Sequence, residues 1–590
     1  MKQSPNLDKN NDLNKTKFKL FNVLNQIQSK ASNNQSIKKD MQKAMNNLEN
    51  YYMAFNKIAR NQGAGTIGVD KQTINGISIK RIQKWHEEYI NNQYVPKPVR
   101  KILIPKSNGK KRPLGIPTIK DRTIQQVMNQ TLIPFYEKKF SQWSYGFRPN
   151  RSCHDAIKRF QQRFKGIDYF IKVDIEGYFD AINHDILLKL INQDVKKHKT
   201  IKTIYNWLTA GLMENGSYGK TFSGTPQGGI ISPLLSNIYL HKYLDMKMSE
   251  MVQLGIPRNR ANPIYKKIYK MGGRAKTQKV NSQINTNPNT RVEYLRYADD
   301  FIIGIKGEQD KAIKVLNQVK NLLTKELKLT ISADKTKIIK ANKGIRFLGY
   351  LLKVNPTNES RPRKTGKNSL NGKTRMMIPK DEISTRITKL RWKNNRKIIQ
   401  DKALSYREEL EIVKTYKSVL HGIIRYFAYG ANLGQLTYLA YIAEYSCLKT
   451  LAGKYKTSIK KIRQKFRFKK TWAIKYTSKD SKVKREIWNI MNWEKIKSMR
   501  NHKSNIDVDT IPNKYFLCGG TFLTDRLSAI ECEICKISNV ELEIHHRKTV
   551  RNRNWKSVLN KETMVLCKYC HRNKTNQQIK SFNLNLSRKK

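Results

Sequence analysis

Two adjacent aspartates set between apolar runs constrain the fold of this chain most strongly. They are Asp299 and Asp300 in the segment EYLRYADDFII, which runs from Glu293 to Ile303. Short apolar runs on both sides of a polar pair predict two strands joined by a tight turn. Because Asp is common in hairpin turns, the pair alone is also consistent with residues that only stabilise the turn.

A third carboxylate favours a chemical role. The segment YFIKVDIEGYFDAINH ends an apolar strand on Asp174, and we expect this strand to lie beside the Asp299 hairpin. Carboxylates held this close raise one another's pKa unless a cation lies between them. Oxygen ligands of this kind favour Mg²⁺. Two Mg²⁺ ions roughly 4 Å apart would activate a 3′-hydroxyl and stabilise a leaving pyrophosphate, so the three aspartates predict a site for nucleotide addition.

The charge of the whole chain predicts a polyanionic partner. Its 590 residues include 116 Lys and Arg against 45 Asp and Glu, which gives a formal net charge of +71. An excess of this size favours nucleic acid over a scatter of solvated lysines. The 28 Tyr and 19 Phe supply material for packed cores and for stacking on bases, which argues against a disordered chain.

The length of the chain predicts roughly three or four domains. Residues 1–45 are polar and rich in Asn and Lys, and we expect a loosely held arm with one helix near Phe18–Ile27. Residues 100–353 alternate β-rich runs with amphipathic stretches, which predicts a mixed α/β domain. Residues 354–375 are expected to form a linker or an exposed hairpin, and residues 376–485 a helical domain.

Secretion and membrane insertion are not indicated. The N-terminus lacks the apolar segment of a signal peptide, and no run of about eighteen apolar residues occurs, so we expect no membrane partner. Of the seven cysteines, four form two CxxC pairs near the C-terminus. In a chain that is not secreted, such pairs indicate a metal site over disulfides.

The paired cysteines suit a tetrahedral structural Zn²⁺ site, with Cys532, Cys535, Cys567 and Cys570 as ligands. A zinc ribbon that only stabilises a basic tail is the simpler interpretation. The adjacent histidines 545 and 546 and a third at 571 weaken it, because four sulfurs complete the zinc coordination and leave the histidines for other work.

The order of these segments resembles the group II intron-encoded reverse transcriptases. FIKVDIEGYFD, SGTPQGGIISPLLSNIYLHKYLD and LRYADDFIIG resemble the successive palm motifs of that family, and LTISADKTKI and IRFLGYLL resemble its last two palm blocks. Earlier, ARNQGAGTIGVD resembles its N-terminal extension, and KKRPLGIPTIKDR and YGFRPNRSCHDAI resemble its fingers. The resemblance implies an N-terminal extension at 46–99 and fingers and palm at 100–353. One departure is Asp334, where the family usually has Glu.

The resemblance also implies roles for single residues. Asp174, Asp299 and Asp300 match the catalytic triad that holds two Mg²⁺ ions, with Asp300 the least direct ligand. Phe179 matches the aromatic residue that lies under the incoming sugar and leaves no room for a 2′-hydroxyl, so dNTPs are the expected substrates.

Four further residues are expected to contact the nucleotide. Gln227 lies in a Gly-rich loop that resembles the one positioning template and nucleotide, although a simple Gly/Pro turn is the alternative. Phosphate is recognised by the forked guanidinium of Arg or by the point charge of Lys. The resemblance places three of these in the fingers: Lys110, Lys111 and Arg112.

The helical domain at 376–485 resembles the thumb or maturase domain, which binds intron RNA and helps it fold for splicing. Between Lys449 and Lys470 the sequence holds ten Lys or Arg, no acidic residue and interleaved aromatic residues, which favours a surface that follows nucleic acid. Core packing is an equal alternative for the Tyr and Leu residues of this domain. The predicted RNA-binding residues are Lys460, Lys461, Arg463, Lys465 and Arg467.

The C-terminal residues 529–590 resemble the HNH nuclease domain of many group II intron proteins. By position His546 resembles the general base, His545 and His571 resemble ligands of one catalytic Mg²⁺, and Asn560 resembles the central Asn. The family often has a further histidine where this chain has Thr575. Residues 486–528 would then be a DNA-binding segment.

The expected fold is therefore a multidomain α+β protein. It combines a right-hand polymerase with an α-helical thumb and a small zinc-containing ββα-metal domain. The expected function is RNA-directed DNA synthesis, intron splicing and cleavage of a target DNA.

Two other functions remain open, a splicing cofactor with a decayed nuclease or polymerase and an RNA-directed RNA polymerase. The frequent Lys, Asn and Ile are typical of an AT-rich genome and favour a mitochondrion over a plastid or a bacterial cytoplasm. The oligomeric state is open, a dimer included.

Overall fold

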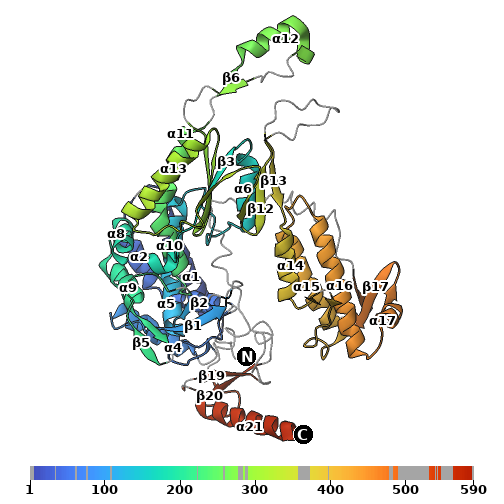
Figure 1. Cartoon of the computed structure of the whole chain (residues 1–590). Coiled ribbons are helices and arrows are strands. Elements are labelled where there is room, and N and C mark those ends of the chain that lie inside the picture. Colours follow the sequence, from blue (N-terminus) through green and yellow to red (C-terminus); the bar gives the residue numbers. More distant parts are fainter. Residues whose placement is uncertain are drawn as a thin grey trace.

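The computed structural model describes a main body, a helical part and a small C-terminal part. Figure 1 colours the body from blue to green, the helical part orange and the C-terminal part red. The described residues are 6–33, 35–59, 61, 63–74, 77–105, 109, 111–214, 216–221, 223–226, 228–256, 259–276, 283–285, 290–356, 372–395, 397–477, 483–488, 531–538, 540, 542–546 and 563–587.

The N-terminal segment is packed onto the main body. Helices α1 (Asn6–Ser32), α2 (Lys38–Met45) and α3 (Leu48–Ala59) all pack against the long helix α5 (Ile119–Lys139). Leu20, Leu24 and Ile27 are at most 2% exposed, because their helical spacing turns one face of α1 toward the core. The expectation of a loosely held arm is therefore wrong for this part of α1. Its many polar residues hid the apolar face in the sequence.

A four-stranded antiparallel sheet forms the centre of the body, in the order β10-β3-β9-β8. Its strands are β3 (Tyr169–Val173), β8 (Val292–Tyr297), β9 (Asp300–Ile305) and β10 (Lys337–Lys340). Tyr297 pairs with Asp300, so β8 and β9 form the predicted hairpin. Val173 pairs with Phe301, which confirms that the strand ending on Asp174 lies beside this hairpin.

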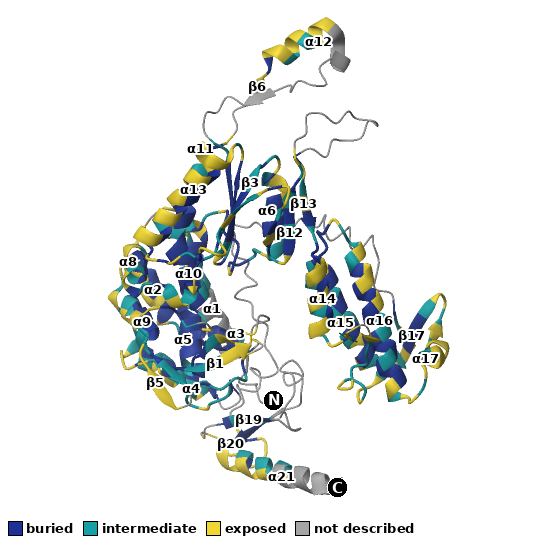
Figure 2. Ribbon diagram, in the orientation of Figure 1, coloured by how far each residue is buried: buried dark blue, intermediate teal, exposed yellow. Residues whose placement is uncertain are grey.

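Both faces of β3, β8 and β9 are largely buried, and Figure 2 shows these central strands in dark blue. Alternate residues of a strand point to opposite faces. Ile171 and Val173 therefore join a core with α10 (Ser232–Leu240) and the N-terminal helices, while Phe170 joins a second core with α6 (Cys153–Arg163). After α10 the chain continues through a π-helical segment (His241–Asp245) into α11 (Met246–Leu254).

A second sheet, in the order β2-β1-β4-β5, lies at the outer side of the body. It contains β1 (Val99–Pro105), β2 (Lys111–Ile116), β4 (Leu212–Glu214) and β5 (Ser217–Gly219). Helices α4 (Ile79–Ile90), α8 (His184–Val195) and α9 (His198–Thr209) complete this side of the body, and α13 (Gln309–Asn321) follows β9. A short hairpin of β6 (Asn259–Ala261) and β7 (Gln283–Asn285) with α12 (Pro263–Lys276) projects from the far end.

The helical part follows a three-stranded sheet of β11 (Ile345–Phe347), β12 (Tyr350–Val354) and β13 (Thr374–Met377). Because β12 pairs antiparallel with β13, the two ends of the predicted linker lie side by side, and residues 357–371 lie outside the described part. Helices α14 (Lys380–Lys389), α15 (Glu409–Tyr426), α16 (Gly434–Lys454) and α17 (Ile459–Lys465) follow. Their apolar residues share the second core with α6, so this part is joined to one face of the central sheet.

Short strands complete the helical part: β14 (Lys393–Asn394), β15 (Lys397–Ile398), β16 (Arg467–Phe468), β17 (Thr471–Thr477) and β18 (Val483–Ile487). The C-terminal part is a hairpin of β19 (Leu542–His546) and β20 (Thr563–Cys567) followed by α21 (Lys568–Ser587). Among the helices of the described residues, none has the length and apolar character that crossing a bilayer requires.

Candidate polymerase site, basic surface and cysteine cluster

The three predicted aspartates lie at one edge of the central sheet. Asp174 directly follows β3, Asp299 lies in the β8–β9 turn, and Asp300 begins β9. Burial raises the pKa of Asp300, and the charges of Asp299 and Asp174 raise it further, while Lys172 opposes both. The strand register therefore brings together carboxylates that repel one another.

Two lysines supply countercharge to these carboxylates. Lys172 Nζ lies 3.5 Å from Asp300 Oδ1, and Lys335 Nζ lies 3.0 Å from Asp174 Oδ2. The side chain of Lys335 is 70% exposed, so this pair is a weak and replaceable contact.

The aspartate site fits a hard divalent cation. The side chains of Asp174 and Asp300 are 33% and 37% exposed, which leaves room for an ion that keeps part of its water shell. The backbone N–H of Asp174 is tied to Thr336 Oγ1 at 3.3 Å, and its carbonyl accepts from the Ser332 N–H at 2.9 Å. The carboxylate of Asp174 is thus carried by a fixed backbone.

Phe179 lies in the short helix α7 (Tyr178–Ala181), which is tied to the Gly-rich loop. The Thr225 N–H donates to the Phe179 carbonyl at 2.7 Å, and the Gly224 N–H donates to the Ile182 carbonyl at 2.8 Å. Gly224 has φ +86°, and a Cβ there would lie 2.7 Å from Asp180 Cα. Only glycine fits this contact, so the loop and the Phe179 segment are held as one unit.

The remaining nucleotide-contact predictions lie in the outer sheet or outside the described residues. Lys111 and Arg112 are exposed at the start of β2, where they pair with Pro105 and Ile104 of β1. Lys110 and Gln227 lie outside the described residues.

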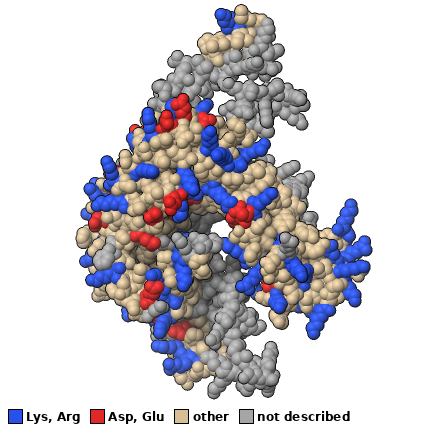
Figure 3. Space-filling view, viewed as in Figure 1, with Lys and Arg blue, Asp and Glu red and all other residues tan. Residues whose placement is uncertain are grey.

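The predicted RNA-binding residues gather at α17 and β16, and all five are exposed. Some are held by aromatic or acidic neighbours: Arg463 Nη2 lies 3.3 Å from Glu444 Oε1, and Lys465 Nζ lies 3.7 Å from the centre of the Tyr455 ring. Lys460, Arg463 and Arg467 line an open hollow of about 760 Å³ whose walls include the stacked rings of Trp472 and Trp488. Figure 3 shows Lys and Arg side chains clustered over this part, at the right of the view.

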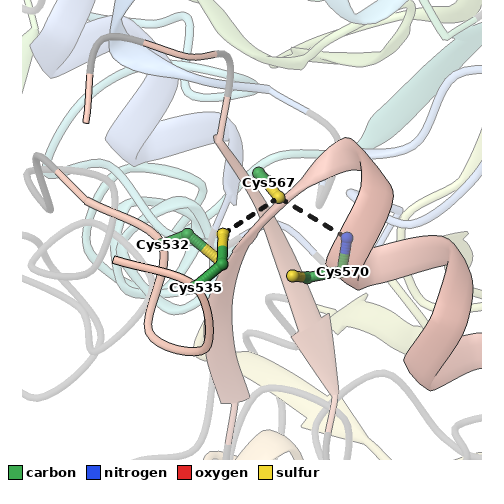
Figure 4. A group of neighbouring side chains, drawn as sticks. All are labelled: Cys532, Cys535, Cys567 and Cys570. Atoms are coloured by element: carbon green, nitrogen blue, oxygen red, sulfur yellow. Dashed lines mark hydrogen bonds between the residues drawn. The ribbon is translucent and has the colours of Figure 1, made fainter. Parts of the chain in front are cut away.

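The four C-terminal cysteines converge from two segments (Figure 4). Cys567 ends β20, and Cys570 lies in the first turn of α21. Cys532 and Cys535 lie in a turn that precedes β19 in the sequence. Their sulfur atoms all lie within 4.8 Å of one another, and the Cys535 and Cys567 sulfurs are 3.6 Å apart. A tetrahedral ion with Zn–S bonds of about 2.3 Å requires S···S separations of about 3.8 Å. The cluster therefore fits zinc.

Two of the predicted nuclease histidines lie together beside this cluster. The rings of His545 on β19 and His571 on α21 have centroids 5.1 Å apart. His571 Nδ1 lies 2.5 Å from Glu543 Oε2, a carboxylate to which the sequence analysis gave no role. Its place two residues before His545, on the same face of a strand, was the pattern that could have revealed it.

The structure describes the other predicted nuclease residues only in part. The backbone of His546 pairs with that of Thr563 in the β19–β20 hairpin, while the His546 side chain and Asn560 lie outside the described residues. The hydroxyl of Thr575 donates to the His571 carbonyl at 2.8 Å. Residues 489–530, most of the predicted DNA-binding segment, also lie outside the described part.

Two family models match the chain in order. Residues 104–352 match the model of reverse transcriptases, RNA-dependent DNA polymerases, and residues 371–502 match the model of type II intron maturases. The first match contains all three aspartates, and the second contains the basic surface at α17. The chain is thus a mixed α+β multidomain protein with a reverse transcriptase domain and a maturase domain.

Full-length relatives agree with these matches. The chain is 36% identical to the group II intron-encoded protein LtrA of Lactococcus lactis subsp. cremoris, over 88% of this chain and 93% of that protein. It is 30% identical to the COX1/OXI3 intron 2 protein of Saccharomyces cerevisiae, over 95% of this chain and 68% of that protein. The chain therefore belongs to the group II intron-encoded proteins, as a reverse transcriptase and intron maturase.

Proposed function

We propose that this reverse transcriptase and maturase also nicks a DNA target and copies its intron RNA from the cut end. The observation that carries the polymerase part is the meeting of Asp174, Asp299 and Asp300 at one edge of the central sheet. Two Mg²⁺ ions held there would activate a primer 3′-hydroxyl and stabilise the leaving pyrophosphate.

The residues around the aspartates bind and orient the substrates. Phe179, fixed by the Gly-rich loop, excludes a 2′-hydroxyl and selects dNTPs over rNTPs. Gln227 contacts the template or nucleotide from the same loop. The cations of the fingers bind the triphosphate: Lys110, Lys111 and Arg112.

The proposed domains follow the sequence analysis, with one change. The N-terminal extension at 46–99 is preceded by helices that belong to the same core. The fingers and palm span 100–353, the thumb or maturase domain 376–485, the DNA-binding segment 486–528 and the HNH domain 529–590. In the maturase domain the five cations of α17 and β16 bind intron RNA.

The C-terminal part is proposed as a zinc-stabilised HNH nuclease. Cys532, Cys535, Cys567 and Cys570 would hold Zn²⁺ as a structural ion. His545 and His571 would hold one catalytic Mg²⁺, and His546 would act as the general base. We add that Glu543 orients His571 through their hydrogen bond.

One observation favours a second candidate, a maturase whose nuclease has decayed. Thr575 stands where the related nucleases often have a histidine, and its hydroxyl is engaged by the backbone of its own helix. The relatives include a protein of the bacterium Lactococcus lactis and a mitochondrial protein of Marchantia polymorpha. We propose a mitochondrial location for this protein.

The polymerase proposal predicts a separation of activities. Asp299→Ala/Asp300→Ala should lower dNTP incorporation by more than about 100-fold, because the metal ligands are lost. Intron RNA binding and assisted splicing should stay near wild type, since no phosphate-contacting cation is removed. Primer extension with dNTPs and with rNTPs, beside a splicing assay, measures both activities.

Glu308→Ala/Asp310→Ala provides the matched control, because it removes two exposed carboxylates near α13. Equal loss of splicing and polymerisation in the aspartate variant would contradict the proposed separation. Efficient incorporation of rNTPs by the wild type would instead favour an RNA polymerase.

The basic surface predicts a salt-dependent loss of RNA binding. Neutralising all five cations of α17 and β16 to Gln should weaken RNA binding and flatten its log–log salt slope by about 0.7 to 0.9 for each lost phosphate contact. Extension of an annealed primer at low salt should suffer less. Filter binding across a salt series measures the slope.

Five exposed lysines on and after α13 serve as the control for the same charge change: Lys311, Lys314, Lys320, Lys325 and Lys328. If both sets weaken binding equally, the RNA is attracted by net charge alone and the surface at α17 is not its site.

The cysteine cluster predicts one tightly held zinc ion per chain. Cys532→Ser/Cys567→Ser should remove that zinc, because a tetrahedral site loses half of its sulfur ligands. Metal analysis of the purified proteins measures the loss, with Cys153→Ser as a control that leaves the cluster intact. A full equivalent of zinc in the double variant would disprove the site.

The nuclease proposal predicts Mg²⁺-dependent nicking of one strand of the DNA target. His546→Ala should abolish nicking while cDNA synthesis from a supplied primer persists, and Glu543→Gln should reduce nicking by about 10- to 100-fold. Gel analysis of end-labelled target DNA gives the readout. Wild-type protein that binds its target without nicking it would favour the decayed nuclease.

A further inference from the structure

A fully buried ion pair lies behind the turn that carries Asp299 and Asp300. The side chains of Arg296, at the end of β8, and Asp245, at the end of the π-helical segment, are both 0% exposed. Arg296 Nε lies 2.7 Å from Asp245 Oδ1, and Arg296 Nη2 lies 2.5 Å from Asp245 Oδ2. The two parallel contacts fix the plane of the guanidinium.

The third nitrogen of Arg296 reaches the turn itself. Nη1 donates to the Ala298 carbonyl at 2.7 Å and to Asn237 Oδ1 at 3.0 Å. Ala298 directly precedes Asp299 and has φ +59°, a left-handed conformation that residues other than glycine seldom adopt. The hydrogen bond from Arg296 therefore holds a strained residue next to a proposed metal ligand.

The turn is held from its other side by Gly146. A Cβ at this position would lie 2.2 Å from the Ala298 nitrogen, so the two backbones are in direct contact. Asn237 Nδ2 donates to the Gly146 carbonyl at 2.8 Å, and the Tyr145 N–H donates to the Arg296 carbonyl at 2.9 Å. Ala298 is thus enclosed between this backbone segment and the guanidinium.

Stability alone is a weak reason for such a pair. Removing two charges from water is unfavourable, and well-packed apolar residues often serve a core as well or better. The polar atoms of this pair are satisfied, because the Tyr294 hydroxyl donates to Asp245 Oδ1 at 2.9 Å. Burial alone would raise the pKa of Asp245, but the charge of Arg296 and its hydrogen bonds outweigh burial and hold this pKa at about 2.

We propose that Arg296, oriented by Asp245, is a positioning residue for the polymerase: it fixes the Ala298 carbonyl and so sets where Asp299 and Asp300 present their carboxylates to Mg²⁺. This inference rests on the proposed role of these two aspartates. The Arg296 side chain is 0% exposed, so it acts only through the backbone of the turn.

Arg296→Lys tests the proposal, because lysine keeps the charge but cannot reach the carboxylate and the carbonyl in one plane. In single-turnover primer extension we expect a 10- to 100-fold slower incorporation, a several-fold higher Mg²⁺ concentration for half-maximal rate, and a dNTP KM within about threefold of wild type. Intron RNA binding should not change.

A second buried arginine, which contacts the segment before Gly146 but not the turn itself, supplies the control. Arg148 is 1% exposed, pairs with Glu137 at 2.7 Å, and donates to backbone carbonyls that are not in the turn. Arg148→Lys should lower the melting temperature without shifting the Mg²⁺ dependence. If Arg296→Lys behaves in the same way, the pair is only a core element and the proposal is overturned.

Two further variants make every outcome decisive. Asp245→Asn keeps the shape of the carboxylate and is judged by the same Mg²⁺ shift if Arg296→Lys does not fold. If neither protein folds, the pair serves stability and the proposal fails. Asp299→Ala is measured in parallel: full activity there would refute the site assignment itself, whereas an inactive Asp299→Ala with an unshifted Arg296→Lys would refute only the positioning role.

Discussion

The mutual repulsion of three carboxylates at one sheet edge is the constraint on which the rest of the structure depends. Asp174, Asp299 and Asp300 meet because β3 pairs antiparallel with β9 and because β8 and β9 are joined by a two-residue turn. Without a cation between them the three carboxylates repel one another, so their own charges oppose this arrangement. The energy that holds them together has to come from packing elsewhere in the body.

That packing comes from both faces of the central sheet. One face shares a core with the N-terminal helices and α10, and the other shares a core with α6 and the helices of the maturase domain. A strand buried on both faces has little freedom to slip, since a shift of one residue would exchange its two apolar sets. The register that brings the three aspartates together is therefore maintained by residues far from them, including those of the maturase domain.

The sequence predicted features that depend on local pattern and missed those that depend on distant partners. The β8–β9 hairpin and the strand ending on Asp174 follow from apolar alternation over a few residues. The packing of α1 was harder to predict. Asn and Lys residues separate its apolar positions, and the helix it packs against, α5, lies about ninety residues away in the sequence. The ion pair of Asp245 and Arg296 joins residues 51 positions apart. Nothing in the neighbouring sequence distinguishes these two charged side chains from charged side chains on the surface.

The strong positive charge of the chain and its acidic site act over different distances. At physiological ionic strength exposed charges are screened beyond about 8 Å, so the many surface cations attract a nucleic acid without neutralising a carboxylate cluster farther away. Among the described residues, Lys172 and Lys335 lie close enough to the aspartates to offset the repulsion, and the side chain of Lys335 is mostly exposed and replaceable. A phosphate backbone drawn to the protein by its net charge therefore meets local repulsion at the three aspartates. Divalent cations between carboxylates and phosphates would remove that repulsion, so in the proposed function metal binding joins the general affinity for nucleic acid to the chemistry of the site.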